Sequence, residues 1–246
     1  YEIPLRLVGS EMCIRDRFSE QLLKPETLNF EVPTQLQSVL RDYQVQGYKW
    51  MKLLASYGFG GVLADDMGLG KTLQSITFIL SELEHIRTRK QPVLIVCPSS
   101  LTYNWLHEFM TFAPEIQALV MDGSAVERKT MLQELGNVDV VITSYPLLRR
   151  DLGYYEKQTF HTVFFDEAQA FKNPMTQTAR SVKKINADNH FALTGTPMEN
   201  SLAELWSIYR VIFPQLFNSL EEFSNMQRKD IARRVRPFLL RRMKED

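Results

Sequence analysis

From residue 58 onward, short and almost continuous apolar runs alternate with longer stretches in which apolar residues recur every three or four positions. Short apolar runs bounded by turn residues predict buried strands, and the longer spacing predicts amphipathic helices. The expected strands cover residues 62–64, 93–97, 116–120, 138–143, 163–166 and 191–194. The expected helices cover residues 73–83, 101–112, 126–135, 179–185 and 202–212. This alternation predicts an α/β fold with a mostly parallel sheet and helices on both faces.

The first 57 residues follow a different pattern. Residues 34–57 predict an amphipathic helix or helix pair, with an apolar side made of Leu36, Leu40, Tyr43, Gly47, Trp50, Met51 and Leu54. Residues 1–17 contain L-V-G-S-E-M-C-I-R-D-R, which looks like a translated sequencing-adaptor remnant. We therefore expect a non-native leader at 1–17, a helical extension at 18–57, the main α/β lobe at 58–217 and a basic segment at 218–246.

Polar clusters follow directly on five of the expected strands. They are a glycine loop after Ala64, Pro98-Ser99-Ser100, Thr143-Ser144-Tyr145, Asp166-Glu167-Ala168-Gln169 and Thr194-Gly195-Thr196-Pro197. Each of the last four, taken alone, is typical of an ordinary turn. In open α/β sheets, however, ligands bind outside the carboxyl ends of the strands. Together the clusters predict one ligand-binding rim.

The glycine loop has the chemistry of a phosphate-binding loop. Asp65-Asp66-Met67-Gly68-Leu69-Gly70-Lys71-Thr72 follows a β-branched run, although Asp65 stands where the strict pattern has its first glycine. Backbone N–H groups of such a loop cradle phosphates, a role in which Lys71 would reach the β- and γ-phosphates and Thr72 would bind Mg²⁺. Asp166 would complete the metal site and Glu167 would act on the attacking water.

Composition narrows the class of protein. The 246 residues include 29 Lys and Arg and 29 Asp and Glu, so zero net charge argues against a dedicated basic nucleic-acid-binding domain. No apolar run approaches the length of a membrane span. The two cysteines are far apart and the four histidines scattered, so we expect no disulfide framework, no zinc site and a cytoplasmic location.

Residues 228–244 are the one clear charge asymmetry, with eight Lys or Arg against one Asp. Two interpretations stay open for this segment. It is either a solvated helix face followed by a connector or a surface that contacts phosphates.

The order of motifs resembles the Swi/Snf-type helicase-like ATPases of superfamily two, over residues 36–244. The resemblance rests on Leu40-Arg41-Asp42-Tyr43-Gln44, Asp65 to Thr72, Asn104-Trp105, Thr143 to Tyr145, Asp166 to Gln169, Lys172-Asn173 and Leu193 to Asn200. The residues that flank the glycine loop look more like the bacterial branch. The resemblance implies a RecA-like P-loop NTPase lobe and explains Asp65, since this family typically has an acidic residue there.

The same resemblance implies roles for individual residues. Gln44 would recognise adenine, and the loop from Asp65 to Thr72 would bind ATP and Mg²⁺. Asp166 would hold the metal, and Glu167 would polarise the water. Nucleic-acid contact is implied for Pro98, Ser99, Ser100, Thr143, Ser144 and Tyr145. Coupling between the two sites is implied for Gln169, Thr194, Gly195 and Thr196. Gln169 and Glu199 stand where many relatives have histidine and glutamine, which bears on coupling more than on nucleotide binding.

The implied function is that of the ATP-binding lobe of a double-stranded DNA translocase. Family members are similar to a pair of RecA-like lobes, and no segment up to Asp246 resembles the second lobe, so we expect this chain alone to hydrolyse ATP poorly. The implied partners are duplex DNA and a second lobe in cis, with RNA polymerase or other DNA-bound proteins as targets and a nucleoid location if the source is bacterial. A strand-separating RNA or DNA helicase and a non-enzymatic, nucleotide-gated binding module remain alternatives.

Overall fold

The computed structural model describes residues 10–24, 28–195 and 201–245. Within them lies a seven-stranded sheet in the order β3-β4-β2-β5-β6-β1-β7, in which every neighbouring pair is parallel. The strands are β1 Gly61–Leu63, β2 Val93–Cys97, β3 Ala118–Val120, β4 Val140–Ser144, β5 Thr159–Phe165, β6 Asn186–Leu193 and β7 Leu239–Leu240. The predicted parallel α/β sheet is therefore confirmed.

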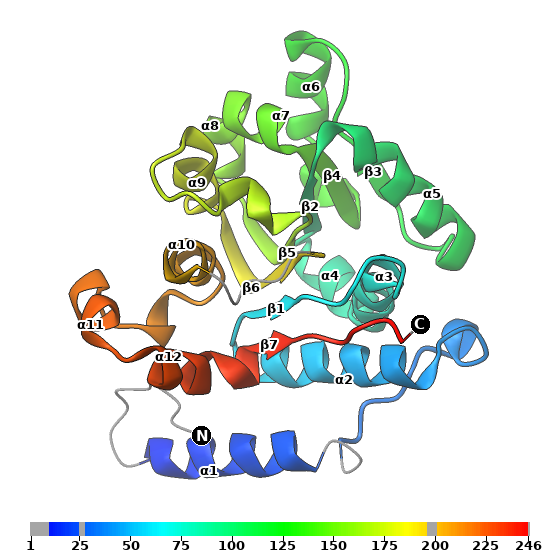
Figure 1. Ribbon diagram of the computed structural model, residues 1–246. Helices are drawn as coiled ribbons and strands as arrows, with labels where there is room; N and C mark the ends of the chain where they lie inside the picture. Colours follow the sequence, from blue (N-terminus) through cyan, green and yellow to red (C-terminus); the bar gives the residue numbers. More distant parts are fainter. Residues whose placement is uncertain (1–9, 25–27, 196–200, 246) are drawn as a thin grey trace.

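Helices cover both faces of the sheet (Figure 1). On one face lie α2 Asp42–Ser56, α3 Lys71–Ser81, α4 Leu83–Arg89 and α5 Thr102–Phe112. On the other lie α7 Tyr145–Arg150, α8 Leu152–Tyr155, α9 Gln177–Val182 and α10 Leu202–Ile212. The remaining helices are α1 Ser10–Leu23, α6 Ala125–Leu132, α11 Leu220–Asn225 and α12 Arg228–Val235.

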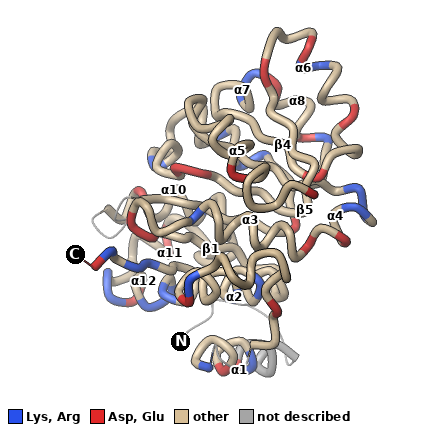
Figure 2. Tube along the Cα trace, turned by 90° about the vertical axis from the view of Figure 1, so that its right-hand side faces the viewer, with Lys and Arg blue, Asp and Glu red and all other residues tan. Residues whose placement is uncertain are grey.

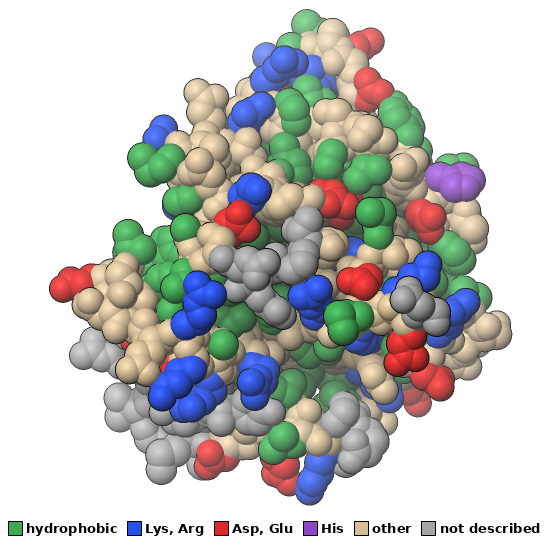
Figure 3. Space-filling view, in the orientation of Figure 1, with side chains coloured by type: hydrophobic (Ala, Val, Ile, Leu, Met, Phe, Trp, Pro, Cys, Tyr) green, Lys and Arg blue, Asp and Glu red, His purple; other side chains and the backbone are tan. Residues whose placement is uncertain are grey.

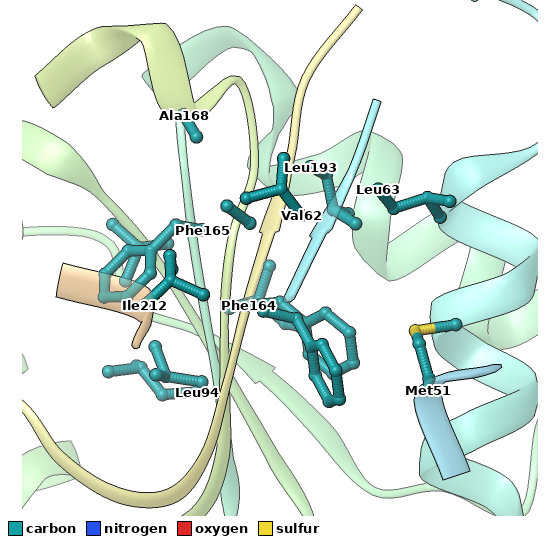
Figure 4. Packing of buried hydrophobic residues seen from close by; sticks show 14 of the residues in the cluster. Met51, Val62, Leu63, Leu94, Phe164, Phe165, Ala168, Leu193 and Ile212 are labelled. Carbon is teal, nitrogen blue, oxygen red and sulfur yellow. The ribbon is translucent and has the colours of Figure 1, made fainter. Parts of the chain in front are cut away.

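The core is built around β5, whose residues after Thr159 are all buried. Side chains alternate across a strand, so Phe164 and Phe165 point to opposite faces. Phe164 packs edge-on against Phe78 of α3, while Phe165 packs against Phe171 on the other side. Figure 4 shows Phe165 and Ile212 on one side of the strands, with Phe164 and Met51 on the other. Two apolar layers thus hold the sheet between its helices.

A cluster of aromatic side chains joins α1 to the rest of the chain. Phe18 is fully buried and contacts the rings of Tyr57, Phe59 and Phe238, with centroids 5.1, 5.2 and 5.9 Å away. Helix α1 starts at Ser10, inside the segment expected to be a leader, and continues without a break past residue 17. Residues 1–9 lie outside the described part of the chain.

Several predicted element boundaries change. Strands β5 and β6 begin four and five residues earlier than predicted, and residues 34–57 form a 3-10 turn at Thr34–Leu36 followed by α2. The largest difference is β7, which pairs with β1 through Val62 and Leu239. The expected division at residue 217 is therefore not a boundary of the sheet. No helix in the described ranges is both long and apolar enough to cross a membrane.

Charge is unevenly distributed along the described chain. Figure 2 shows Lys and Arg concentrated along α12 and the segment after it. In α12, Ile231 and Val235 are buried while Arg228 and Lys229 are exposed. The structure thus supports a solvated helix face at α12, but the segment beyond it includes a strand of the sheet.

Glu82, His85 and His161 come together although they looked scattered in the sequence, with one ligand atom of each within 4.8 Å of the others. Lys52 Nζ lies 2.9 Å from the other carboxylate oxygen of Glu82, which makes the group an ion-pair network. Burial raises the pKa of Glu82, but its interactions with His161 and Lys52 outweigh burial and lower that pKa from 4.5 to about 2.

This lowered pKa predicts a specific loss of stability in acid. A carboxyl group whose pKa is lower in the folded state stabilises the fold above its unfolded pKa, near 4.5, and loses that contribution as the pH falls towards 2. The full shift corresponds to about 3 kcal/mol. Unfolding by urea between pH 2 and 7 measures it. The Glu82→Gln variant should lack this part of the pH dependence, whereas Glu84→Gln, at an exposed position of α4, should keep it. Equal pH profiles for wild type and Glu82→Gln would contradict the assignment.

Candidate nucleotide-binding site

The loop between β1 and α3 has the backbone of a phosphate cradle. Gly68 and Gly70 have φ angles of 87° and 85°, which glycine adopts without strain. Gly70 is the N-cap of α3, so the first free N–H groups of this eleven-residue helix lie at the loop. Such a helix start attracts phosphate through its N–H groups and its dipole. The two glycines found in the sequence are thus required by the loop's conformation.

Lys71 lies at the centre of this loop. Its Nζ donates to the carbonyl oxygen of Asp65 at 2.6 Å and lies 3.5 Å from that of Asp66. A Cβ atom added to Gly195 would be 3.9 Å from the same Nζ. The fold therefore brings the polar cluster after β6 next to the lysine, as predicted for clusters that end neighbouring parallel strands. Thr196 lies outside the described residues.

Helix α2 holds the loop from outside. The Tyr43 hydroxyl and Gln44 Nε2 both donate to the carbonyl oxygen of Leu69, at 2.9 and 3.1 Å. Gln44 Oε1 accepts from the backbone N–H of Arg41 at the start of α2. Gln44 is buried and does not line the cavity described below. Adenine recognition by Gln44 stays a prediction, while its contact with the loop is direct.

Asp65 is turned away from the cavity. Its carboxylate is fully buried, and it accepts hydrogen bonds from the backbone N–H and the guanidinium of Arg242 and from Gln74. Nucleotide binding by Asp65 stays a prediction, and the structure shows its carbonyl oxygen accepting from Lys71 while its side chain is buried. Asp65 thus supports the loop on the side that faces away from the cavity.

A cavity of about 500 Å³ opens between the loop, α5 and the end of β5. It is lined by Met67, Gly68, Gly70, Lys71, Thr72, Leu73, Leu101, Asn104, Trp105, His107, Glu108, Phe112, Asp166 and Glu167. The residues predicted to handle phosphate, metal and water therefore share one cavity. Two carboxylates opposite a lysine and a helix N-terminus fit a phosphate with a divalent cation, because the cation would balance the charge of both.

Asp166 is almost completely enclosed. Trp105 Nε1 and the backbone N–H of Glu167 donate to its two carboxylate oxygens, each at 2.9 Å. Burial raises the pKa of Asp166 and the charge of Glu167 adds to this, while the hydrogen bond from Trp105 and the charge of Lys71 act in the opposite direction. A cation would favour the ionised form of such a buried carboxyl. The donor set fits a metal ligand.

Glu167 begins a relay of hydrogen bonds towards β6. Its φ of 48° is in the left-handed region, where a residue other than glycine is uncommon and is often held by a functional site. Its carboxylate accepts from Gln169 Nε2 at 2.5 Å, and Gln169 Oε1 accepts from the Thr194 hydroxyl at 3.0 Å. The predicted coupling residues Gln169 and Thr194 thus connect the Glu167 carboxylate with the end of the neighbouring strand.

The residues predicted to contact nucleic acid fall into two groups. Ser99 and Ser100 are exposed and Pro98 is half-buried, and Ser144 joins Ser99 in lining a second cavity of about 440 Å³. Thr143 and Tyr145 are buried. Nucleic-acid contact at these two positions stays a prediction, and the Tyr145 hydroxyl donates to the carbonyl oxygen of Asp166 at 2.6 Å.

Three residues of the site were not predicted as such. The sequence shows Trp105 as part of a motif, Tyr43 as part of a motif and of a predicted apolar helix face, and Arg242 as one of eight charges in a basic segment. No local pattern marks any of them, because each acts on a partner at least 26 residues away.

Figure 3 shows the face of the molecule seen in Figure 1, with Lys and Arg gathered at its lower left.

Comparisons with known proteins identify relatives of this chain. Residues 43–246 match the SNF2-related domain family. The TATA-binding protein-associated factor MOT1 of Saccharomyces cerevisiae is 34% identical over 99% of this chain. An uncharacterized ATP-dependent helicase, MG018 of Mycoplasma genitalium, is 37% identical over 83%. The chain spans only 15% and 20% of the length of these two relatives.

Two solved structures from Sulfolobus solfataricus are similar in fold. The SWI2/SNF2 ATPase core in complex with dsDNA has a TM-score of 0.79 and 35% identity, over 88% of this chain and 47% of that one. The SWI2/SNF2 ATPase core domain has a TM-score of 0.73 and 35% identity, over 92% of this chain and 46% of that one. The RecA-like sheet expected from the sequence is that of these ATPase cores.

The hydrogen bond from Trp105 to Asp166 predicts a defined effect of Trp105→Phe. Removing a group that orients a metal ligand costs about 10- to 100-fold in metal affinity or activity. We expect the Mg²⁺ concentration needed for nucleotide binding to rise by about that factor, measured by titration of a fluorescent ATP analogue. Trp206→Phe is the matched control, since Trp206 packs on Phe217 and Phe223 away from the cavity. An unchanged Mg²⁺ dependence would show that the bond has no such role.

Proposed function

The chain belongs to the SNF2-related domain family, and on that premise we propose that it is the first ATPase lobe of a motor that moves along duplex DNA. The observation that carries the ATPase part is the meeting of Lys71, Thr72, Asp166 and Glu167 around one cavity. These side chains come from the start of α3 and the end of β5, about a hundred residues apart in sequence. An unrelated glycine turn would not place two carboxylates opposite a lysine.

Each residue has a distinct task in the proposed reaction. Lys71 and the N–H groups at the start of α3 bind the phosphates, and the two glycines allow the backbone to approach them. Thr72 and Asp166 would hold Mg²⁺, which would supply positive charge to neutralise the phosphates. Glu167 would orient the attacking water and accept its proton. The hydrogen bond from Gln169 fixes the direction in which Glu167 points.

The nucleic-acid part of the proposal rests on different support. One of the similar solved structures is of an ATPase core with dsDNA. In this chain, the exposed Ser99 and Ser100 follow β2, and the neighbouring cavity is lined by Ser144 and Arg150 after β4. Hydroxyl groups and an arginine are suited to phosphate oxygens of a nucleic-acid backbone. We assign to these residues the contact with the backbone of duplex DNA.

The proposal also covers parts of the protein beyond this chain. The curated relatives are much longer than this chain, and a second RecA-like lobe in cis would supply the remaining contacts to ATP. RNA polymerase or other DNA-bound proteins are the proposed targets if the source is bacterial. The proposed location is the cytoplasm, on the nucleoid in a bacterium, in keeping with the buried thiol of Cys97.

Phosphate release from ATP by the full-length protein tests this function. We compare no nucleic acid, duplex DNA, single-stranded DNA and RNA, with Lys71→Ala as the inactive control. Duplex DNA should stimulate hydrolysis most, and Lys71→Ala should abolish it, since the lysine binds the phosphates directly. Stimulation mainly by RNA or single strands would replace the translocase with a helicase. No hydrolysis under any condition would leave a nucleotide-gated binding module.

The relay from Glu167 to Thr194 predicts that stimulation can be lost separately from binding. Thr194→Val removes the hydroxyl that donates to Gln169 but keeps the shape of the side chain. We expect duplex DNA to stimulate this variant about five-fold less than wild type, with ATP affinity unchanged, because coupling energies between sites are typically of this size. Thr130→Val, on the exposed side of α6, is the control. Full stimulation of Thr194→Val would exclude this route of coupling.

A further inference from the structure

Asp65 is the residue at which the phosphate-binding loop departs from the strict pattern, and its environment explains the departure. Its carboxylate is completely buried and has two strong donors on Arg242: Nε lies 3.0 Å from Oδ1, and Nη2 lies 2.6 Å from Oδ2. The backbone N–H of Arg242 also donates to Oδ1 at 3.0 Å, and Gln74 Nε2 lies 3.3 Å from Oδ2. A glycine at position 65 could make none of these contacts.

The same guanidinium reaches two further elements. Nη2 of Arg242 donates to Gln74 Oε1 of α3 at 2.6 Å, and Nη1 donates to the carbonyl oxygen of Tyr43 in α2. The guanidinium also lies over the Tyr43 ring, 5.2 Å from its centroid. Tyr43 and its neighbour Gln44 are the residues that hold the carbonyl of Leu69 in the glycine loop. One side chain from the end of the described chain thus contacts Asp65, Gln74 and Tyr43.

The backbone after β7 follows the loop as well. The backbone N–H of Ala64 donates to the carbonyl oxygen of Leu240 at 2.7 Å, and that of Asp66 donates to the carbonyl oxygen of Arg242 at 3.0 Å. The backbone N–H of Lys244 donates to the Asp66 carboxylate at 2.9 Å. Residues 239–245 do not line the 500 Å³ cavity. Any effect of this segment on a nucleotide must therefore act through the loop.

We propose that Arg242 is a positioning residue for the nucleotide: it fixes the loop in its phosphate-binding conformation and thereby links nucleotide binding to the order of residues 239–244. Without Arg242, the buried carboxylate of Asp65 would lose its charged partner, and such a group is unfavourable in the interior. The loop would then shift to bring Asp65 to water, and the N–H groups of residues 68–72 would leave their places. The link is reciprocal, so a bound nucleotide should in turn hold residues 239–244 in place. This inference rests on the proposed nucleotide site.

Arginine variants test the positioning role in this chain. Binding of ATP with Mg²⁺ is measured by calorimetry for wild type, Arg242→Lys, Arg242→Gln and Lys71→Ala, with the thermal midpoint of unfolding recorded for each. Arg242→Lys keeps the charge but loses the forked pair of donors, and it should weaken ATP binding about ten-fold while remaining folded. Arg242→Gln should weaken it further. Arg228→Gln removes an exposed arginine of α12 and should bind as wild type does.

Hydrogen exchange tests the reciprocal effect without any substitution, and so it stands even if Arg242→Gln fails to fold. In the wild-type chain, ATP should slow exchange at the backbone amides of Arg242 and Lys244, as well as at residues 68–72. A merely structural ion pair would not transmit this protection. The Asp65→Asn variant should keep protection at residues 68–72, with weakened affinity, but lose it at Arg242.

The outcomes separate this inference from the proposed function. If wild type does not bind ATP at all, the nucleotide site is wrong and the inference falls with it. If wild type binds and Lys71→Ala does not, but folded Arg242→Lys and Arg242→Gln bind within two-fold of wild type, the inference alone is overturned. Unchanged exchange at Arg242 and Lys244 on addition of ATP would also overturn it.

Discussion

The parallel alignment of the central strands is the constraint on which the other features depend. Strands β2, β5, β6 and β1 run side by side in one direction, so their carboxyl ends lie along a single edge. Strands β1 and β2, and β5 after Thr159, are buried throughout. The residues of the candidate site lie beyond the strand ends, where Lys71 and Asp166 line one cavity and Thr194 donates to Gln169. The site is a direct product of the sheet's direction.

At that edge, the fold itself fixes the positions of the charged groups that line the cavity. The Asp166 carboxyl is buried beside Glu167, and burial, together with the charge of Glu167, raises its pKa. The Trp105 indole and the backbone of Glu167 hold both of its oxygens, so the carboxylate has one orientation. Groups held in this way need little rearrangement when charge develops during a reaction. Lys71 and the N-terminus of α3 provide the opposite charge across the cavity.

Local patterns in the sequence predict the strands and loops that neighbouring residues determine, and they miss contacts between residues far apart in the chain. The run Val93–Cys97 predicts its strand because all five residues are apolar and buried, and the glycines at 68 and 70 predict their loop because few other residues tolerate the backbone angles. The strand Leu239–Leu240 lies within a basic segment, and only its pairing with β1 makes it a strand. Tyr145 has the surroundings of a turn in sequence, yet the fold closes over it. Contacts such as that of Arg242 with Asp65 span 177 residues, and no periodicity reports them.

The place of β1 in the sheet has a consequence for the order in which the protein forms during synthesis. Both neighbours of β1, namely β6 and β7, are made long after it, and the second of them ends at Leu240. Strands β2, β4 and β5 can pair as they leave the ribosome, but the strand that carries the phosphate-binding loop gains its second neighbour only when residues 239–240 have been made. Pairings between such distant segments form slowly, and exposed edges are open to misassembly meanwhile. Arg242, which supports the nucleotide loop at Asp65, is thus made 177 residues after its partner.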